Sequence, residues 1–246
     1  MFSTLKRKTK NAFYNLKGKI YLECNGVRAA FDSTYGSRWR RLMWRYKTEY
    51  EILEDIIDEL RPDDVYFDIG ASLGLHTCFP ANKYPSCGEI VAVEPYPPNL
   101  EYLQKNVSLN GLSKVQVIEA AMSDSNGNSY FNGTSKSLNP NSSGPSVKTV
   151  VGDELINQGK LRKPNVVKID VEGSEPLVIR GLTDTLQTNA CRLLYLEAHL
   201  SAPHRRSIQD YGMNLTELKN VLQKCGFRLT KLKQPREKEI FFKGIK

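Results

Sequence analysis

The sequence predicts an α/β fold, a doubly wound and mostly parallel sheet that ends in a C-terminal antiparallel hairpin. Short runs of apolar and β-branched residues alternate with segments whose apolar residues are spaced as on one face of a helix. Strands that alternate with helices pair in parallel and are covered on both faces. Near the end of the chain two strand-like runs, residues 227–232 and 239–243, follow each other without a helix between them, which predicts the hairpin.

Breaker residues place the boundaries of several elements. The first core helix ends before Pro62, which cannot continue it, and two later helices end at Gly111 and Gly226. Residues 123–146 are rich in Ser, Asn and Gly and predict a long loop that interrupts the alternation. The expected core elements are helices over 48–60, from 75 onward, 99–110, 175–180 and 215–224, and strands over 65–69, 89–94, 115–119, 166–171 and 193–198.

Composition and charge divide the chain in two. Of the residues, 40% are hydrophobic and 25% charged, which suits a folded domain. The net charge is +8, and much of the excess lies near the start of the chain. We therefore expect a basic N-terminal extension over residues 1–47 and the main domain over 48–246. Residues 1–20 have apolar side chains at helical spacing with lysines between them, so we expect a helix there. We favour a solvated or frayed helix that packs on the core, and a basic amphipathic helix that contacts an anionic surface is the alternative.

The cysteines and the hydropathy favour a reducing, aqueous compartment. The 5 cysteines are odd in number and widely spread, no two form a CxxC pair, and only 3 histidines accompany them. A disulfide framework or a zinc site is therefore not expected. No apolar run is long enough to span a membrane, and no apolar segment of a secretory signal follows the basic start. We expect a cytoplasmic protein.

A glycine turn follows the first predicted core strand, in the segment FDIGASLG over residues 67–74. Gly70 and Gly74 let the backbone bend and approach a ligand without a Cβ clash. A dinucleotide fingerprint that starts at Gly70 would place glycines at positions occupied by Ser72 and Leu75. The turn therefore favours a nucleoside ligand without a pyrophosphate, and a purely structural turn is the alternative.

Polar residues follow the next two strands. Glu94 ends a strand roughly 20 residues after the turn, where an acidic side chain can accept hydrogen bonds from both hydroxyls of a ribose. Ala120 and Ala121 are small enough for a flat base to lie against the backbone. Ser123 or Asp124 would reach the polar edge of that base, or else form an Asx-type turn.

Three charged residues share one side of the strand over 166–171. Alternation points Lys168, Asp170 and Glu172 the same way, toward the carboxyl end of the sheet. Charges in an apolar strand are costly unless they pair or serve a site. A structural ion pair between Lys168 and Glu197 is the alternative.

These segments, in this order, resemble the FkbM family of methyltransferases. The matching motifs are FDIGASLGLHT, VAVEP, AAMSD, VKIDVEGSEPLVIRG and LYLEAHL, and the resemblance covers residues 63–200 or so. It implies a Rossmann-like class I methyltransferase domain and an enzyme of class 2.1.1 that uses S-adenosylmethionine, a nucleoside without a pyrophosphate. Members of the family commonly O-methylate hydroxyls of polyketides, sugars or glycans.

The resemblance also implies residue roles. The methyl-transfer side would be formed by Asp170, Glu172 and Gly173. The cofactor would be bound at its amino-acid end by Asp68, Gly70, Ala71 and Gly74, at its ribose by Glu94, and around its adenine by Ser123 and Asp124.

A hydroxyl is a poor nucleophile unless its proton leaves during the attack, so a general base is expected. Asp170, Glu172 and His199 are the candidates. A magnesium ion held by Asp170 with Glu172 or Glu197 would replace the base, and the sequence leaves both routes open.

Two other functions remain as alternatives. Residues 38–46 interleave arginines with aromatic residues, as in single-strand nucleic-acid binders. We favour a structural element whose Trp39 and Trp44 pack on the core, and we expect a small-molecule or glycan partner and no nucleic acid. A non-catalytic Rossmann-like binding module is the second alternative, against which Asp68, Glu94 and Asp170 together argue.

Overall fold

The computed structural model describes residues 13–15, 18–34, 36–85, 88–131, 144–203, 205–232 and 238–246. Its elements are β1 (Phe13–Asn15), β2 (Lys19–Cys24), β3 (Val27–Asp32), α1 (Gly36–Thr48), α2 (Tyr50–Glu59), β4 (Val65–Ile69), α3 (Leu75–Lys83), β5 (Glu89–Val93), α4 (Pro97–Leu109), β6 (Val115–Ile118), β7 (Ala121–Ser123), β8 (Gly127–Tyr130), β9 (Ser146–Val151), α5 (Gly152–Asn157), β10 (Val166–Ile169), α6 (Glu175–Gly181), α7 (Thr183–Gln187), β11 (Leu193–His199), the 3-10 helix η1 (Ile208–Tyr211), α8 (Leu215–Lys224), β12 (Arg228–Lys231) and β13 (Glu239–Ile245).

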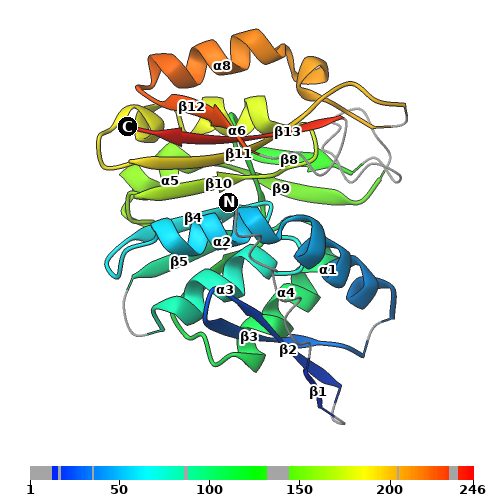
Figure 1. Ribbon diagram of the computed structural model, residues 1–246. Coiled ribbons are helices and arrows are strands. Elements are labelled where there is room, and N and C mark those ends of the chain that lie inside the picture. Colours follow the sequence, from blue (N-terminus) through cyan, green and yellow to red (C-terminus); the bar gives the residue numbers. More distant parts are fainter. Residues whose placement is uncertain are drawn as a thin grey trace, which may run out of the picture.

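The central sheet has seven strands in the order β12-β13-β11-β10-β4-β5-β6 (Figure 1). The pairs β11–β10, β10–β4, β4–β5 and β5–β6 are parallel, whereas β13 is antiparallel to both of its neighbours. The predicted doubly wound sheet and its C-terminal hairpin are confirmed. The chain runs outward from β4 to β6 and then returns to β10 on the other side of β4, so the order reverses between β4 and β10.

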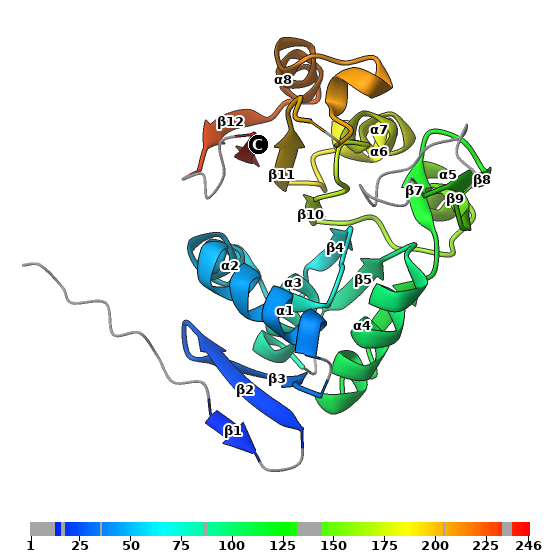
Figure 2. The ribbon, with the colours of Figure 1, turned by 90° about the vertical axis from the view of Figure 1, so that its right-hand side faces the viewer.

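Helices cover both faces of this sheet, with α2 and α3 on one side and α6, α7 and α8 on the other (Figure 2). Alternation along β4 explains the two layers. Tyr66 belongs to the hydrophobic core on the α2 and α3 side, whereas Phe67 and Ile69 belong to the core on the α6 and α8 side. Every residue of β4 is buried, as is typical of a central parallel strand.

The helix that we expected over residues 1–20 is wrong where the structure describes it, because β1 and the start of β2 are strands. Ile20, Leu22 and Cys24 are buried and alternate with less buried residues, which is the period of a strand. Asn25 and Gly26 both have positive φ and turn β2 into β3, as Asn-Gly pairs do in hairpins. The remaining residues of that segment lie outside the described part.

The described part of residues 1–47 packs against the rest of the fold. Ile20, Leu22, Phe31 and Leu42 lie in the same buried cluster as the apolar residues of α2 and α3. Trp39 packs against this cluster as expected, but Trp44 is 46% exposed, so its predicted packing on the core is wrong. The division of the chain at residue 48 stays a prediction.

The expected loop over residues 123–146 is partly wrong. It contributes β8 to a small sheet of order β7-β9-β8, and residues 132–143 lie outside the described part. Among the described helices, none combines the length and the apolar composition that a membrane span requires.

Candidate active site

A cavity opens where the strand order of the sheet reverses, at the carboxyl ends of β4, β5 and β10. Open α/β sheets bind their ligands at this place. The cavity encloses about 580 Å³, including space open to solvent. Its walls include four predicted site residues and two unexpected arginines, namely Gly70, Glu94, Asp170, Glu172, Arg41 and Arg45.

The glycine turn after β4 forms one wall of the cavity. Gly70 has a φ of +83°, and a Cβ there would lie 1.9 Å from the carbonyl oxygen of Asp170, so only glycine fits. Its amide donates to the carbonyl of Val93 at 2.9 Å. Ser72 has a φ of +52°, and its buried hydroxyl has no hydrogen-bond partner among the residues that the structure describes. This hydroxyl is a donor and acceptor near the place where a ligand would lie.

Glu94 is held rigidly at the end of β5. Its Oε2 accepts a hydrogen bond from the amide of Ser72 at 2.7 Å, and its Oε1 accepts from the amide of Tyr96 at 2.9 Å and from Asn99 at 3.4 Å. Burial raises the pKa of Glu94 in spite of these bonds, which lower it in part. Each oxygen has a second lone pair, so the carboxylate can also accept from a ligand hydroxyl.

An apolar wall faces this end of the cavity. Tyr96, Ala121, Met122 and Phe131 line it, and the rings of Tyr96 and Phe131 meet edge to face with 5.3 Å between centroids. Tyr96, Met122 and Phe131 were not among the predicted site residues. Phe131 follows β8 inside the segment that was expected to be a loop. Flat apolar surfaces of this kind suit a nucleobase.

Five residues expected around the cofactor lie outside this lining as the described residues define it. Asp68 is fully buried and binds Lys168 Nζ at 3.0 Å and the hydroxyl of Thr77 at 2.6 Å. Asp124 accepts a hydrogen bond from Arg180 Nε at 2.8 Å. Ala71, Gly74 and Ser123 are close-packed against neighbouring elements. Cofactor contacts of these five residues stay predictions.

Asp170 follows β10 and lies at the floor of the cavity. Arg45 of α1 donates to its Oδ2, and Lys168 Nζ lies 3.7 Å from the same oxygen. Burial favours a raised pKa, but Arg45, Lys168 and His199 outweigh it and hold the pKa of Asp170 well below its usual range. Lys168 thus forms the buried ion pair of the alternative interpretation, but its partners are Asp68 and Asp170 and not Glu197.

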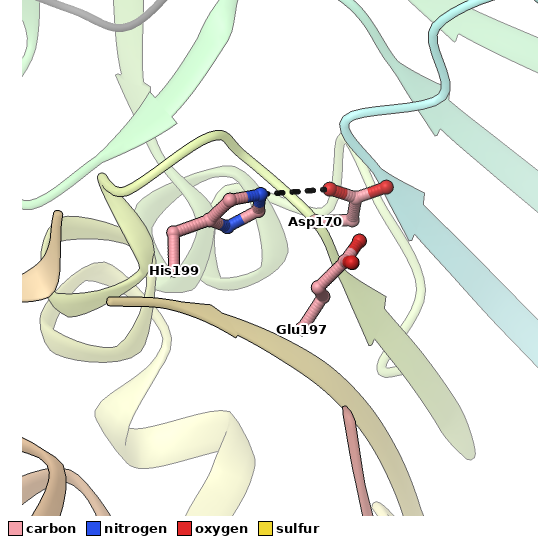
Figure 3. Close-up of side chains that lie close together, drawn as sticks. All are labelled: Asp170, Glu197 and His199. Atoms are coloured by element: carbon pink, nitrogen blue, oxygen red, sulfur yellow. Dashed lines mark ion pairs between the residues drawn. The ribbon is translucent and has the colours of Figure 1, made fainter. Parts of the chain in front are cut away.

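His199 is the last residue of β11 and is fully buried. Its ring faces Asp170 (Figure 3). Its Nδ1 lies 2.7 Å from Glu175 Oε1, whereas its Nε2 lies 4.0 Å from Asp170 Oδ1 and 3.6 Å from Glu172 Oε2. Burial favours a lowered pKa, but Glu175 and the other nearby carboxylates raise the pKa of His199 to about 10. An imidazole that is already protonated cannot take a proton from a substrate.

Glu172 occupies the turn between β10 and α6. Its φ is +55°, and the next residue, Gly173, has a φ of +106° with the backbone of Arg206 too close for any side chain. The Glu172 side chain is 28% exposed and lies 4.0 Å from Arg41. Of the three candidate bases, Glu172 is therefore the most accessible from the cavity.

Arg41 and Arg45 are the site residues that sequence analysis missed. They lie four residues apart on α1, with Glu49 a further four residues on, and Arg45 Nε is 3.0 Å from Glu49 Oε1. This spacing places Arg41 and Arg45 on one face of α1, with Glu49 directly after the helix, and the sequence contains this signal. The basic composition of the segment instead favours the N-terminal extension for both arginines.

Comparisons with known proteins identify the family. The methyltransferase FkbM domain matches residues 68–229, which is more than half of the chain. Hexuronic acid methyltransferase AglP from Haloferax volcanii is 34% identical over 156 residues, which cover 59% of this chain and 62% of that protein. Methyltransferase 1 from Beauveria bassiana is 28% identical over 151 residues, covering 50% of this chain and 60% of that protein. The match thus spans about three fifths of each of these relatives.

Solved structures agree on the fold. A methyltransferase FkbM from Methylobacillus flagellatus superposes with a TM-score of 0.55 at 17% identity, over 76% of this chain and 45% of that chain. A precorrin-6y C5,15-methyltransferase from Geobacter metallireducens gives a TM-score of 0.51 at 16% identity, over 80% of this chain and 88% of that chain. At these identities the likeness shows the Rossmann-like class I fold alone. From the domain match, the chain belongs to the FkbM family of methyltransferases.

Proposed function

We propose that the chain transfers the methyl group of S-adenosylmethionine to a hydroxyl of an acidic sugar. One observation carries the proposal: a single cavity at the switch point of an FkbM-family sheet is lined by a fixed carboxylate, Glu94, and by the charged residues Asp170, Glu172 and Arg41. Glu94 and the apolar wall suit a nucleoside, and the charged residues suit a polar acceptor.

The cofactor would lie along the carboxyl ends of β4 and β5. Glu94 would accept hydrogen bonds from the ribose hydroxyls, since its amide partners already fix the orientation of its carboxylate. The adenine would lie on the apolar wall that contains Tyr96 and Phe131. The sulfonium would then lie near Gly70, where the absence of a side chain allows close approach to the backbone.

The acceptor would lie between the sulfonium and Glu172. Its oxygen attacks the methyl carbon, the carbon–sulfur bond breaks, and sulfur keeps the electron pair, which leaves neutral S-adenosylhomocysteine. The acceptor proton passes to Glu172, whose side chain is partly exposed at the cavity wall. Methyl transfer needs alignment above all, so fixing both reactants in one cavity contributes much of the rate.

Arg41 supports an acidic acceptor. Its guanidinium lines the cavity beside Glu172, and an arginine can bind a carboxylate through two parallel hydrogen bonds. The relative AglP is named as a hexuronic acid methyltransferase, and a hexuronic acid carries both the hydroxyl and the carboxylate that this end of the cavity would recognise.

The nucleic-acid alternative has less support. Arg45 is buried in ion pairs with Glu49 and Asp170, and Trp39 packs on the core, so these two residues of the basic and aromatic segment are engaged within the fold. The peripheral contact that we expected from residues 1–20 stays a prediction, and residues 1–12, 16 and 17 of that stretch lie outside the described part.

The test is a transfer assay with methyl-labelled S-adenosylmethionine. Short glycans with terminal hexuronic acid serve as acceptors, the matching neutral glycans as controls, and RNA as the alternative substrate. Label in the uronic acid glycan alone supports the proposal. Label in RNA alone, or no binding of S-adenosylmethionine in calorimetry, would overturn it in favour of a nucleic-acid enzyme or a binding module.

A further inference from the structure

Three side chains that could ligate a metal meet behind the cavity floor, at the carboxyl ends of β10 and β11. They are Asp170, Glu197 and His199, and all three are buried (Figure 3). One atom of each lies within 4.8 Å of the others. Ligands of one ion, with bonds of about 2.0–2.2 Å, lie up to about 4 Å apart, so small side-chain rotations would bring these three around a common centre.

The orientation of His199 points to a ligand at its Nε2. Its Nδ1 lies 2.7 Å from Glu175 Oε1, and because a carboxylate only accepts, Nδ1 carries a proton, which leaves Nε2 as the ring nitrogen that a cation can reach. Glu175 is fixed in turn, since its Oε1 also accepts from the amide of Gly173 at 3.0 Å. Nε2 faces the cluster, where it is buried and has no hydrogen-bond partner among the described residues, and a bound cation would displace its proton and take the lone pair. A carboxylate that orients a histidine in this way is typical of metal sites.

The two carboxylate oxygens of Asp170 face different partners. Arg45 and Lys168 both approach Oδ2, whereas Oδ1 faces His199 Nε2 at 4.0 Å. The cations therefore fix the carboxylate from one side and leave Oδ1 directed into the cluster. Asp170 also lines the cavity, so an ion bound here would be reached from the cavity and would keep coordination positions open toward it.

We propose that Asp170, Glu197 and His199 bind one divalent cation of the manganese type. A donor set of one imidazole nitrogen and two carboxylates suits Mn²⁺ better than Mg²⁺, which prefers oxygen ligands alone. The ion would serve the proposed methyl transfer, on which this part of the inference rests. Held by these three residues, it would supply Lewis acidity toward an acceptor hydroxyl, and Glu172 would take the proton of that hydroxyl.

The test measures Mn²⁺ binding directly, without acceptor or turnover. Chelator-treated protein is titrated with Mn²⁺ in calorimetry, and the bound ion is examined by pulsed electron paramagnetic resonance, which detects nitrogen coordinated to manganese. We expect one bound ion per chain and a nitrogen signal. His199→Gln and Glu197→Gln should each weaken binding at least 10-fold and His199→Gln should remove the nitrogen signal, whereas Glu119→Gln, an exposed carboxylate elsewhere, should change neither.

Each outcome decides one question. If folded wild-type protein binds no Mn²⁺ at millimolar concentration, or binds it without a nitrogen signal, the metal site is overturned, and His199 is an imidazolium held by Glu175. The proposed function survives that result if methyl transfer continues in the presence of chelator. If Mn²⁺ binds with the nitrogen signal but no uronic acid is methylated, the metal site stands and the proposed function fails. Circular dichroism of each variant checks that it is folded.

Discussion

Arg45 of α1 donates a hydrogen bond to Asp170, a residue that follows it by 125 positions in the chain. Only 8% of the Arg45 side chain and 3% of the Asp170 side chain are exposed. Both charged side chains are buried, so their ion pair compensates part of the free-energy cost of removing each charge from water. The pair joins a helix that precedes the central sheet to the floor of the cavity.

Replacing Arg45 should therefore destabilise the fold. Arg45→Met removes the arginine that pairs with both Glu49 and Asp170, two buried carboxylates, and we expect a loss of about 3–5 kcal/mol in the free energy of unfolding, measured in urea. Arg40→Met, on the exposed face of the same helix, should change it by less than about 0.5 kcal/mol. Equal midpoints for wild type and Arg45→Met would contradict the structural role of the pair.

Glu94 should contribute to cofactor affinity. Glu94→Ala removes the acceptor that we assign to the ribose and should weaken binding of S-adenosylmethionine by about 1–3 kcal/mol in calorimetry. Glu89→Ala, at the other end of β5, provides the matched control and should bind as the wild type does. An unchanged affinity of Glu94→Ala would mean that the ribose lies elsewhere.

Arg41 should determine the preference for an acidic acceptor. A hydrogen bond between charged groups contributes about 1.5–3 kcal/mol, so Arg41→Gln should raise KM for a uronic acid glycan by about 10–100-fold. The KM of a neutral glycan and the affinity for S-adenosylmethionine should stay within about 2-fold of their wild-type values, since neither involves this contact. If cofactor affinity falls instead, Arg41 binds the methionine carboxylate. Arg40→Gln is the control.

Glu172 should act in the transfer step and not in cofactor binding. Glu172→Gln keeps the size of the side chain but cannot accept the acceptor proton, and kcat should fall by about 10²–10⁴-fold. Calorimetry should give an unchanged affinity for S-adenosylmethionine. A variant that turns over at the wild-type rate would remove Glu172 as the base.

Asp32 should make stability depend on pH. It is buried, which favours a raised pKa, but hydrogen bonds from Lys105 and Thr34 outweigh burial and lower the pKa below the ordinary 3.8. A lowered pKa stabilises the fold above that ordinary value, and the contribution disappears as the pH falls through the lowered one. Wild-type protein should thus lose more stability than Asp32→Asn below about pH 4, as urea unfolding at each pH would show. Asp63→Asn, on an exposed turn, should follow the wild type.

The central sheet could be predicted because its strands are short apolar runs bounded by glycine and proline. The meeting of Gly70, Glu94 and Asp170 in one cavity followed from topology, since the carboxyl ends of parallel strands lie at one edge. The β2–β3 hairpin was not predicted although Asn25-Gly26 is a hairpin signal, because the apolar residues before it, with lysines between them, have helical spacing.

Other parts of the site depend on tertiary packing. The sequence places Asp68 just before the glycine turn. Only the position of Lys168 on the adjacent strand explains why the Asp68 side chain lies away from the cavity. Likewise, the 3.6-residue period of α1 places Arg41 and Arg45 on one face, but no local pattern indicates which part of the sheet that face meets.

The position of β13 has a consequence for how the chain folds. β13 follows β12 in the sequence but lies inside it in the sheet, between β12 and β11. Within the described sheet, β12 pairs with β13 alone, so it cannot join before β13 has docked on β11. During synthesis β11 therefore presents an open edge until residue 245 has left the ribosome, and an unpaired edge is a template for aggregation. A chain that stops after β12 should expose that edge permanently, and it should be recovered mainly in the insoluble fraction.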